Sequence, residues 1–378
     1  LFFHPRLLIV RRQWQAAEQA VSAATTRPPA SLNTQLAKSN QANDDIRPLA
    51  YGLSVELPID IANRHSIRIE QARHLSAIAK LELAQVAWKL RSSLIEALRQ
   101  HLFFVRLSEA LRHEADLRAK IVAMFNKRIS LGAANQQELL IAQNAWQKTV
   151  VEAVDAQQKA REWKISLASA IALPIAVLDT MSLRDVTPAH VLQLDALEKQ
   201  ALKNRLDLRI ALEKYAQAET QLRLEVARQW PDMSLSVGYA YEYGDKVWSL
   251  NWSQLITWLQ RNKLNIKRAQ SLRQVEAAQV ENTEHQILAD VQNAYTRWVA
   301  AQQALQLQQD ILAKTQQQWL NIKHQLAAGY VGRLDSTLVA AQLEMSKRGV
   351  MYAEFNLMNA QQTLENITEH PITIPAIQ

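Results

Sequence analysis

Two very long stretches without glycine or proline constrain the fold of this chain more than any other feature. They run from Asn63 to Leu131 and from Asn262 to Ala328. Glycine and proline are the residues that most disfavour a helix interior, so each stretch predicts one continuous helix. At a rise of about 1.5 Å per residue, such a helix would be roughly 100 Å long. This length exceeds that of an ordinary globular helix and indicates a coiled coil, a solenoid or a helical tube.

The apolar residues in these stretches recur at steps of three and four residues, as Leu83, Val86, Leu90 and Leu94 illustrate. This period is that of one helical face. Most of these positions are therefore expected to be ordinary helix-packing positions. The Ala- and Gln-rich remainder suits helices that meet neighbours on two sides.

The second half of the chain repeats landmarks of the first half at one constant offset. Leu131-Gly132 aligns with Ala328-Gly329, and Glu138 aligns with Asp335. We therefore predict two structural repeats. Residues 1–187 would hold strands at about 31–38 and 51–60, a long helix at about 63–131, a tip at 132–135 and a return helix at about 136–173. Residues 188–378 would hold strands at about 232–243 and 247–256, a long helix at about 262–328, a tip at 329–334 and a return helix at about 335–368.

The predicted strands alternate between apolar and polar residues. Residues 232–243 place Leu235, Val237 and Tyr239 on one face and serines and small residues on the other, and residues 247–256 do the same with Trp248 and Trp252. This alternation is typical of a transmembrane barrel with lipid outside and water inside. A soluble antiparallel sheet packed against helices would show the same pattern. The acids on the polar face and the clustered aromatics favour the barrel.

Composition excludes several other classes of protein. The formal charge is +7, but Lys and Arg are spread among Asp and Glu without a basic block, so we expect no nucleic-acid partner. The chain has no Cys, its nine His residues form no metal motif, and no window is long and apolar enough for a transmembrane helix. No catalytic motif is present either. We expect no cofactor, no metal site and no enzymatic activity. No signal peptide precedes His4, so we expect the targeting segment to be missing from this sequence.

Four strands cannot close a barrel, and an open strand edge cannot face hydrocarbon. If these strands span a membrane, several copies must share one barrel. Two copies would give a barrel filled by side chains, whereas three would leave room for a pore. The sequence therefore predicts that a duct needs at least three copies.

The junctions between strands and helices resemble those of the TolC family of outer-membrane efflux proteins, over about residues 4–370. Residues 57–64, Leu-Pro-Ile-Asp-Ile-Ala-Asn-Arg, look like the family's "PLFDGGRR" passage. Residues 259–269 look like its "NRNxGxIxxA" passage in the subgroup that serves heavy-metal RND pumps of the cobalt–zinc–cadmium and copper–silver kind, with Leu264 where the family usually has Gly. Residues 204–209 resemble the "RPDL" helix start, with Leu206 in place of Pro, and residues 4–7 resemble its "NPxL" counterpart.

The resemblance implies a mainly α fold with a small β part. It would be a homotrimer with a twelve-stranded transmembrane β-barrel in the outer membrane and a long helical barrel in the periplasm. Its partners would be outer-membrane lipid, a periplasmic adaptor protein and an inner-membrane RND pump. The implied function is a passive exit duct, for heavy-metal cations in the subgroup named above. A duct for drug export or type I protein secretion, and less well a soluble helical scaffold, remain as alternatives.

The resemblance also assigns roles to particular residues. Gly132, Gly329 and Gly332 would lie in the periplasmic tips, where adaptor hairpins dock. Glu138 and Asp335 would each form a ring of three carboxylates at the narrow end, where they would attract cations. A surface acid stabilised by the helix dipole is the alternative for both positions. The predicted site residues are Glu138, Asp335, Arg333 and Tyr330 for the gate, and Tyr239, Tyr241, Tyr243, Trp248, Trp252 and Trp258 for a membrane aromatic girdle.

Overall fold

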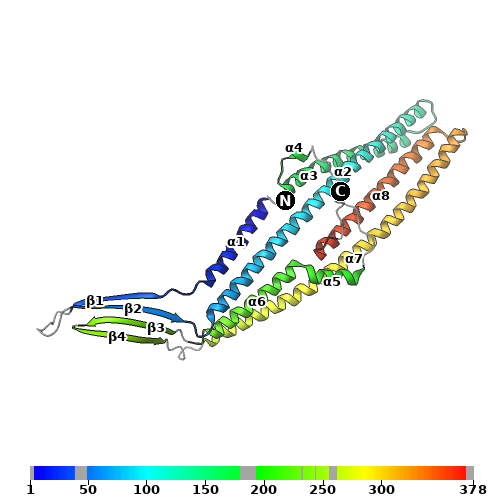
Figure 1. The fold of residues 1–378 in the computed structure, drawn as a ribbon. Helices are drawn as coiled ribbons and strands as arrows, with labels where there is room; N and C mark the ends of the chain where they lie inside the picture. Colours follow the sequence, from blue (N-terminus) through cyan, green and yellow to red (C-terminus); the bar gives the residue numbers. More distant parts are fainter. Residues whose placement is uncertain are drawn as a thin grey trace, which may run out of the picture. The chain divides into compact units, whose positions relative to one another are not determined.

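The computed structural model of the chain describes residues 4–38, 49–178, 193–230, 233–242, 244–254 and 262–371. The described residues form mostly helix, together with four strands (Figure 1). In chain order the elements are α1 (Pro5–Thr25), β1 (Ser31–Lys38), β2 (Leu49–Ile59), α2 (Arg64–Ser130), α3 (Gln136–Ile171), α4 (Ile175–Leu178), α5 (Leu194–Asn204), α6 (Leu206–Ala227), β3 (Met233–Glu242), β4 (Asp245–Gln254), α7 (Lys263–Ala327) and α8 (Arg333–Thr368).

The prediction of a mainly helical chain with four strands is confirmed. Some ends differ from expectation. The helix expected to reach residue 173 ends at Ile171, because Ala172 adopts a left-handed conformation with φ of 58° and Pro174 follows closely. The helix expected from residue 335 already begins at Arg333, and the strand expected from residue 51 begins at Leu49.

The chain forms two compact units, and each unit combines segments from both halves of the sequence. One unit comprises residues 1–7, 86–205 and 285–378, and the other comprises residues 8–85 and 206–284. The predicted division into two sequence repeats, whose boundary falls outside the described residues, therefore remains a prediction.

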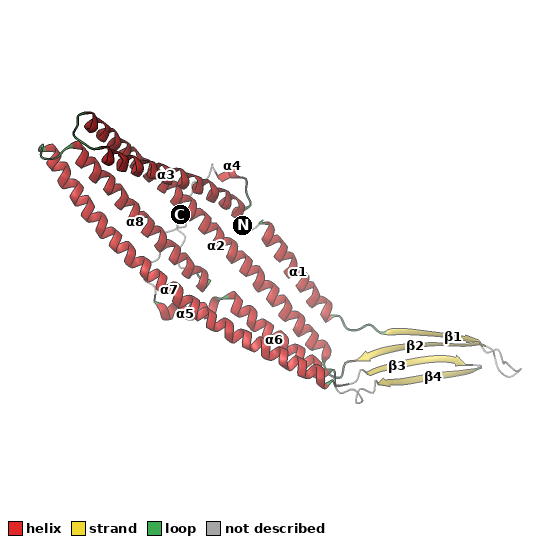
Figure 2. Cartoon of the chain, turned by 180° about the vertical axis from the view of Figure 1, so that it is seen from behind, coloured by secondary structure: helices red, strands yellow, loops and turns green. Residues whose placement is uncertain are grey.

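The sheet lies in the second unit and has the order β1-β2-β3-β4, with every neighbouring pair antiparallel (Figure 2). Cross-strand register aligns the apolar residues: Leu32 lies opposite Val55, Val55 opposite Val237, and Val237 opposite Leu250. The alternate positions carry small and polar residues, and the Ser234 hydroxyl donates to the Glu56 carboxylate on that side. The sheet thus has one apolar face and one polar face across all four strands.

In the first unit, α2 packs between α3 and α8. Phe103 and Leu107 of α2 form a buried cluster with Ala156 of α3 and Phe355 of α8, whose ring stacks on Phe103 at 3.9 Å between centroids. On its other side α8 contacts α7 through a hydrogen bond between Ser346 and Thr315. These contacts join the four long helices into one layer in the order α3, α2, α8, α7. The helices α2, α8 and α7 can be followed side by side in both views (Figures 1 and 2).

Candidate functional site: the helical tips and the strand face

The first tip joins α2 to α3 and is closed by a glycine in the left-handed region. Gly132 has φ of +68°, its N–H donates to the Ile129 carbonyl at 2.9 Å, and the Ala133 N–H donates to the Arg128 carbonyl at 2.8 Å. This pair of bonds is a Schellman motif, which satisfies the last carbonyl groups of the helix. Leu131 is exposed beside it. The local sequence therefore ends the helix within a single turn.

The second tip, between α7 and α8, repeats this geometry. Gly329 has φ of +78°, its N–H donates to the Leu326 carbonyl at 3.1 Å, and the Tyr330 N–H donates to the Gln325 carbonyl at 2.9 Å. Two glycines at equivalent places in the sequence therefore end two long helices by the same motif.

The two predicted gate carboxylates lie at the starts of the return helices. The Glu138 carboxylate accepts a hydrogen bond from the Asn135 N–H at 3.2 Å, and the Asn135 side chain accepts from the Glu138 N–H at 2.8 Å, which is a complete capping box. The Asp335 carboxylate accepts from the Gly332 N–H at 3.2 Å. Gly332 has no side chain to return the bond, so only half of the box forms there. Both acids thus stabilise helix starts, and both side chains are exposed.

The other two predicted gate residues, Tyr330 and Arg333, are exposed in the single chain. Tyr330 is 84% exposed. Arg333 is the first residue of α8, is also exposed, and has no side-chain ion pair within the described residues. Within the described residues, one chain brings none of the four gate residues together with another, so the carboxylate rings and the gating roles of Tyr330 and Arg333 stay predictions.

Close to the tips, the contact of α2 with its neighbours is apolar. Ile121 of α2 is buried with Leu334 and Ala341 of α8. A cavity of about 260 Å³ lies here, and Glu138 and Leu338 are on its lining. The tip-side contact is therefore mainly apolar, and Arg118 of α2, which also lines the cavity, donates to the Met345 sulfur of α8 at 3.1 Å.

Farther from the tips, the contact between α2 and α8 contains a buried ionic cluster that the sequence did not reveal. The Glu114 carboxylate, whose side chain is 1% exposed, lies 2.7 Å from the Arg118 guanidinium and 3.6 Å from that of Arg348. Arg348 also pairs with Glu152 of α3 at 2.8 Å. One carboxylate from α2 thus ties its own helix to α8, and Arg348 extends the network to α3.

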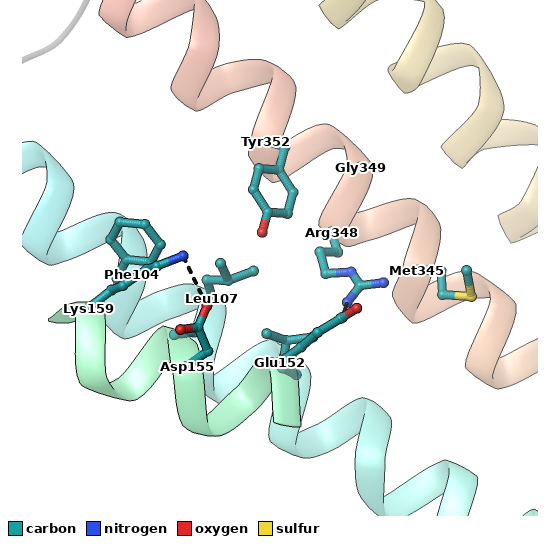
Figure 3. A pocket seen from close by; sticks show the side chains of 11 residues that line it. Phe104, Leu107, Glu152, Asp155, Lys159, Met345, Arg348, Gly349 and Tyr352 are labelled. Atoms are coloured by element: carbon teal, nitrogen blue, oxygen red, sulfur yellow. Dashed lines mark hydrogen bonds and ion pairs between the residues drawn. The ribbon is translucent and has the colours of Figure 1, made fainter. Parts of the chain in front are cut away.

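The same three helices line a groove of about 480 Å³ (Figure 3). On one side Lys159 pairs with Asp155 at 2.9 Å, and on the other Arg348 pairs with Glu152. The Tyr352 hydroxyl points into the space between these pairs (Figure 3), and burial raises the pKa of Tyr352 above its usual range. Two acids and two bases balance one another in the groove, so it offers no net charge to a ligand.

The predicted aromatic girdle lies on the apolar face of the sheet as far as the structure describes it. Tyr51 stacks on Tyr241 with 5.3 Å between ring centroids, and Tyr239 lies 5.0 Å from Trp248. Trp248 is 77% exposed. Further girdle residues are Trp252, which is also exposed, and Tyr243 and Trp258, which lie outside the described residues.

Within the described residues, none of the helices is long and apolar enough to cross a membrane. The same part of the chain contains no group of three or more His, Asp or Glu side chains placed to hold a metal ion.

Comparison with known proteins gives matches at the level of structure alone. No protein-family model matches the chain, and no curated protein matches it in sequence. The outer membrane protein VceC of Vibrio cholerae aligns with a TM-score of 0.76 at 16% identity, over 97% of this chain and 93% of VceC. The outer membrane channel MtrE of Neisseria gonorrhoeae aligns with a TM-score of 0.75 at 15% identity, over 99% of this chain and 88% of MtrE. CusC, described as forming a transmembrane channel, aligns with a TM-score of 0.74 at 16% identity, over 97% and 89% of the two chains. The chain therefore has the fold of these bacterial outer-membrane channel proteins.

Proposed function

We propose that this chain is one protomer of a trimeric outer-membrane exit duct in a tripartite efflux system. The observation that carries this proposal is the sheet, in which all four strands align apolar residues on one face and polar residues on the other. Leu36, Leu53 and Leu250 on the apolar face are exposed in the single chain. Lipid outside and water inside would satisfy the two faces at once.

The strand order explains why several copies are needed. β1 and β4 are the two edges of the sheet, and neighbouring strands alternate in direction. The β4 edge of one copy can therefore pair antiparallel with the β1 edge of the next. Three copies would close the barrel, remove every edge from lipid and leave a pore.

The helical layer supports the same assembly. Its edge helices are α3 and α7, and both expose apolar side chains that the single chain leaves uncovered. On α3 these include Val151, Val154 and Ile165, and on α7 they include Leu307, Ile311 and Leu320. Copies arranged in a ring would cover these residues by packing α3 of one protomer against α7 of the next, and a closed helical tube would result.

The duct would be passive and would have no catalytic centre, because the inner-membrane pump would supply the energy for transport. The tips at Gly132 and Gly329 would dock the periplasmic adaptor, and Glu138 and Asp335 would form the cation-attracting rings at the narrow end. Both carboxylates are exposed and fixed in direction by their hydrogen bonds to the backbone, which supports a defined position in a ring. Tyr330 and Arg333 would contribute contacts between protomers.

For the cargo we propose heavy-metal cations, on the basis of the junction over residues 259–269 that resembles the metal subgroup. Drug export or type I protein secretion is the alternative. The pump would select the cargo. Sensitivity of a deletion strain to copper, silver, zinc, cobalt and cadmium would therefore distinguish a metal duct from a duct for drugs or proteins. Unchanged metal resistance together with new drug sensitivity would reject the metal cargo.

Conductance of the purified protein in planar lipid bilayers tests the duct. We expect discrete cation-selective channels, with selectivity reduced in Asp335→Ala, because a carboxylate ring concentrates cations in a narrow pore. Asp310→Ala, an exposed acid on α7 away from the tip, is the matched control. Absence of conductance, together with extraction in a soluble fraction, would favour the helical scaffold. Conductance with unaltered selectivity in Asp335→Ala would reject the ring alone.

A further inference from the structure

The end of the sheet that faces the helices carries a concentration of cations. In the second unit, α1 and α6 end there and α2 and α7 begin there (Figures 1 and 2). Contacts hold three of these ends together. The Asn262 side chain donates to the Glu225 carboxylate at 2.8 Å, and Ile67 is buried with Leu224 and Ala227. This position is thus a defined surface, formed where the chain passes from strands to helices.

The start of α7 is the most basic part of this surface. Its first eleven residues include four cations and no acid. Arg273 pairs with Glu219 at 2.9 Å. The other three, Lys263, Lys267 and Arg268, are exposed and have no side-chain ion pair within the described part of the chain. Arg68 of α2 and Arg27, between α1 and β1, are exposed in the same way. These five residues are called the basic belt below.

Helix stability does not explain the basic belt. The start of a helix carries a partial positive charge, so a cation in the first turn destabilises the helix. The return helices follow the rule, since α3 and α8 have Glu138 and Asp335 in their first turns. The start of α2 also follows it, because the Asp60 carboxylate accepts from the Arg64 and His65 N–H groups. The first turn of α7, by contrast, contains Lys263 and no acid. Lys263 is therefore placed against the local preference, and no acid within the described residues pairs with it or with the other four cations of the basic belt. These unpaired cations indicate an anionic partner outside the chain.

Two large apolar side chains accompany the basic belt. Leu264, between Lys263 and the rest of the belt, is 81% exposed, and Trp230 at the end of α6 is 62% exposed. Exposed Trp and Leu beside Lys and Arg are typical of the boundary between hydrocarbon and lipid head groups, where the apolar part enters the lipid and the charge reaches the phosphate. Nucleic acid or a soluble polyanion would give these apolar side chains no cover.

We propose that the basic belt, with Leu264 and Trp230, binds the head groups of anionic phospholipids where the strands leave the bilayer. This inference rests on the proposed membrane-spanning role of the sheet. The apolar sheet face would lie in the hydrocarbon, and the belt would lie directly beyond it at the phosphates. Each Lys or Arg that lies near the negative surface of an anionic leaflet raises the affinity for that surface by about fivefold.

The test reconstitutes the full-length protein into bilayers of phosphatidylcholine with spin-labelled phosphatidylglycerol or spin-labelled phosphatidylcholine as the probe. The fraction of motionally restricted probe reports which lipid the protein holds. We expect phosphatidylglycerol to be preferred at low salt, and the combined variant Lys263→Gln, Lys267→Gln, Arg268→Gln to lower that preference by about fivefold or more. The control Lys89→Gln, Lys120→Gln, Lys314→Gln removes three exposed lysines elsewhere and should leave the preference unchanged.

Salt gives a second measurement that needs no variant. The preference of the unaltered protein should fall steeply as NaCl is raised, because the Debye length shortens from about 10 Å at 0.1 M to about 3 Å at 1 M. Equal restriction of the two probes at low salt would overturn the inference and leave the duct intact. Equal losses in the two triple variants would also overturn it. A protein that cannot be inserted into any bilayer would overturn the duct and the belt together.

Discussion

Replacing either tip glycine by alanine should loosen its tip by an amount that the structure defines. Gly132 and Gly329 have φ of +68° and +78°, where an L-residue costs about 1–2 kcal/mol. A Cβ atom at either position meets no other atom within 4 Å, so the cost is one of backbone conformation alone. A loss of 1–2 kcal/mol corresponds to an increase of about 5- to 30-fold in the population of the open tip.

Amide hydrogen exchange measures this opening directly. The reporting amides are those of Ala133 and Tyr330, whose bonds to Arg128 and Gln325 close the two Schellman motifs. We expect Gly132→Ala to accelerate exchange at the first tip alone and Gly329→Ala at the second alone, with Asn less harmful than Ala because Asn tolerates positive φ.

The matched control is Gly332→Ala. Its φ of −83° suits any residue, and the nearest atom to a new Cβ is an Asp335 carboxylate oxygen at 3.4 Å. Unchanged exchange in both tip variants, or an equal change in the control, would refute the assignment of these glycines to left-handed helix ends.

Three further predictions concern the buried ion cluster, the sheet faces and the start of α2. Glu114→Gln should lower the thermal midpoint by removing about 1.5–3 kcal/mol, because Arg118 loses its buried charged partner and Arg348 keeps only Glu152. Asp155→Asn, which breaks an exposed pair with Lys159, should cost under about 1 kcal/mol. Equal thermal midpoints for Glu114→Gln and Asp155→Asn would show that burial of the ion pair makes no difference. Leu250→Arg should destabilise the protein in the membrane by about 2–4 kcal/mol, because Leu250 lies on the apolar face of the sheet. Ser249→Arg, on the polar face, should have no such effect. Equal yields of heat-modifiable oligomer from the two variants would contradict this assignment of the faces. Burial acts to raise the pKa of Asp60, but hydrogen bonds from the N–H groups of His65 and Arg64 outweigh it and hold this pKa below its usual range. Its stabilising contribution should therefore be complete above about pH 4 and be lost as the pH falls through the lowered value, and Asp60→Asn should remove this acid-side dependence from melting curves.

The sequence predicted the features that depend on local pattern. A strict period of two identified the strands, because a sheet with two different faces needs that period at each position. Glycine marked both helix ends, because Gly132 and Gly329 are the residues that adopt positive φ without strain. One local signal was overlooked. Asn135 followed three residues later by Glu138 matches the capping-box pattern, and it predicts the backbone bond that this acid makes.

Features that depend on distant pairs could not be read from the sequence. The pairing of Glu114 with Arg348 joins residues more than two hundred positions apart, on helices whose charged residues look like any solvated face. The bond from Asn262 to Glu225 is another example, since it depends on how α6 and α7 meet. The left-handed residue that ends α3 is Ala172 and not a glycine, so the local sequence does not predict this helix end. In each case the tertiary fold selects one partner or conformation from many that the local sequence allows.

Disulfide cross-linking between edge strands tests most directly whether copies of this chain share one barrel. The chain has no Cys, so pairs can be introduced without background. One Cys replaces Asn33 or Gln35 of β1, and a second replaces Ser249, Asn251 or Ser253 of β4, all on the polar face. If copies join edge to edge in threes, oxidation in membranes should give a covalent ladder that ends at the trimer for at least one pair. A ladder that stops at the dimer, or no cross-link for any pair, would contradict the shared barrel.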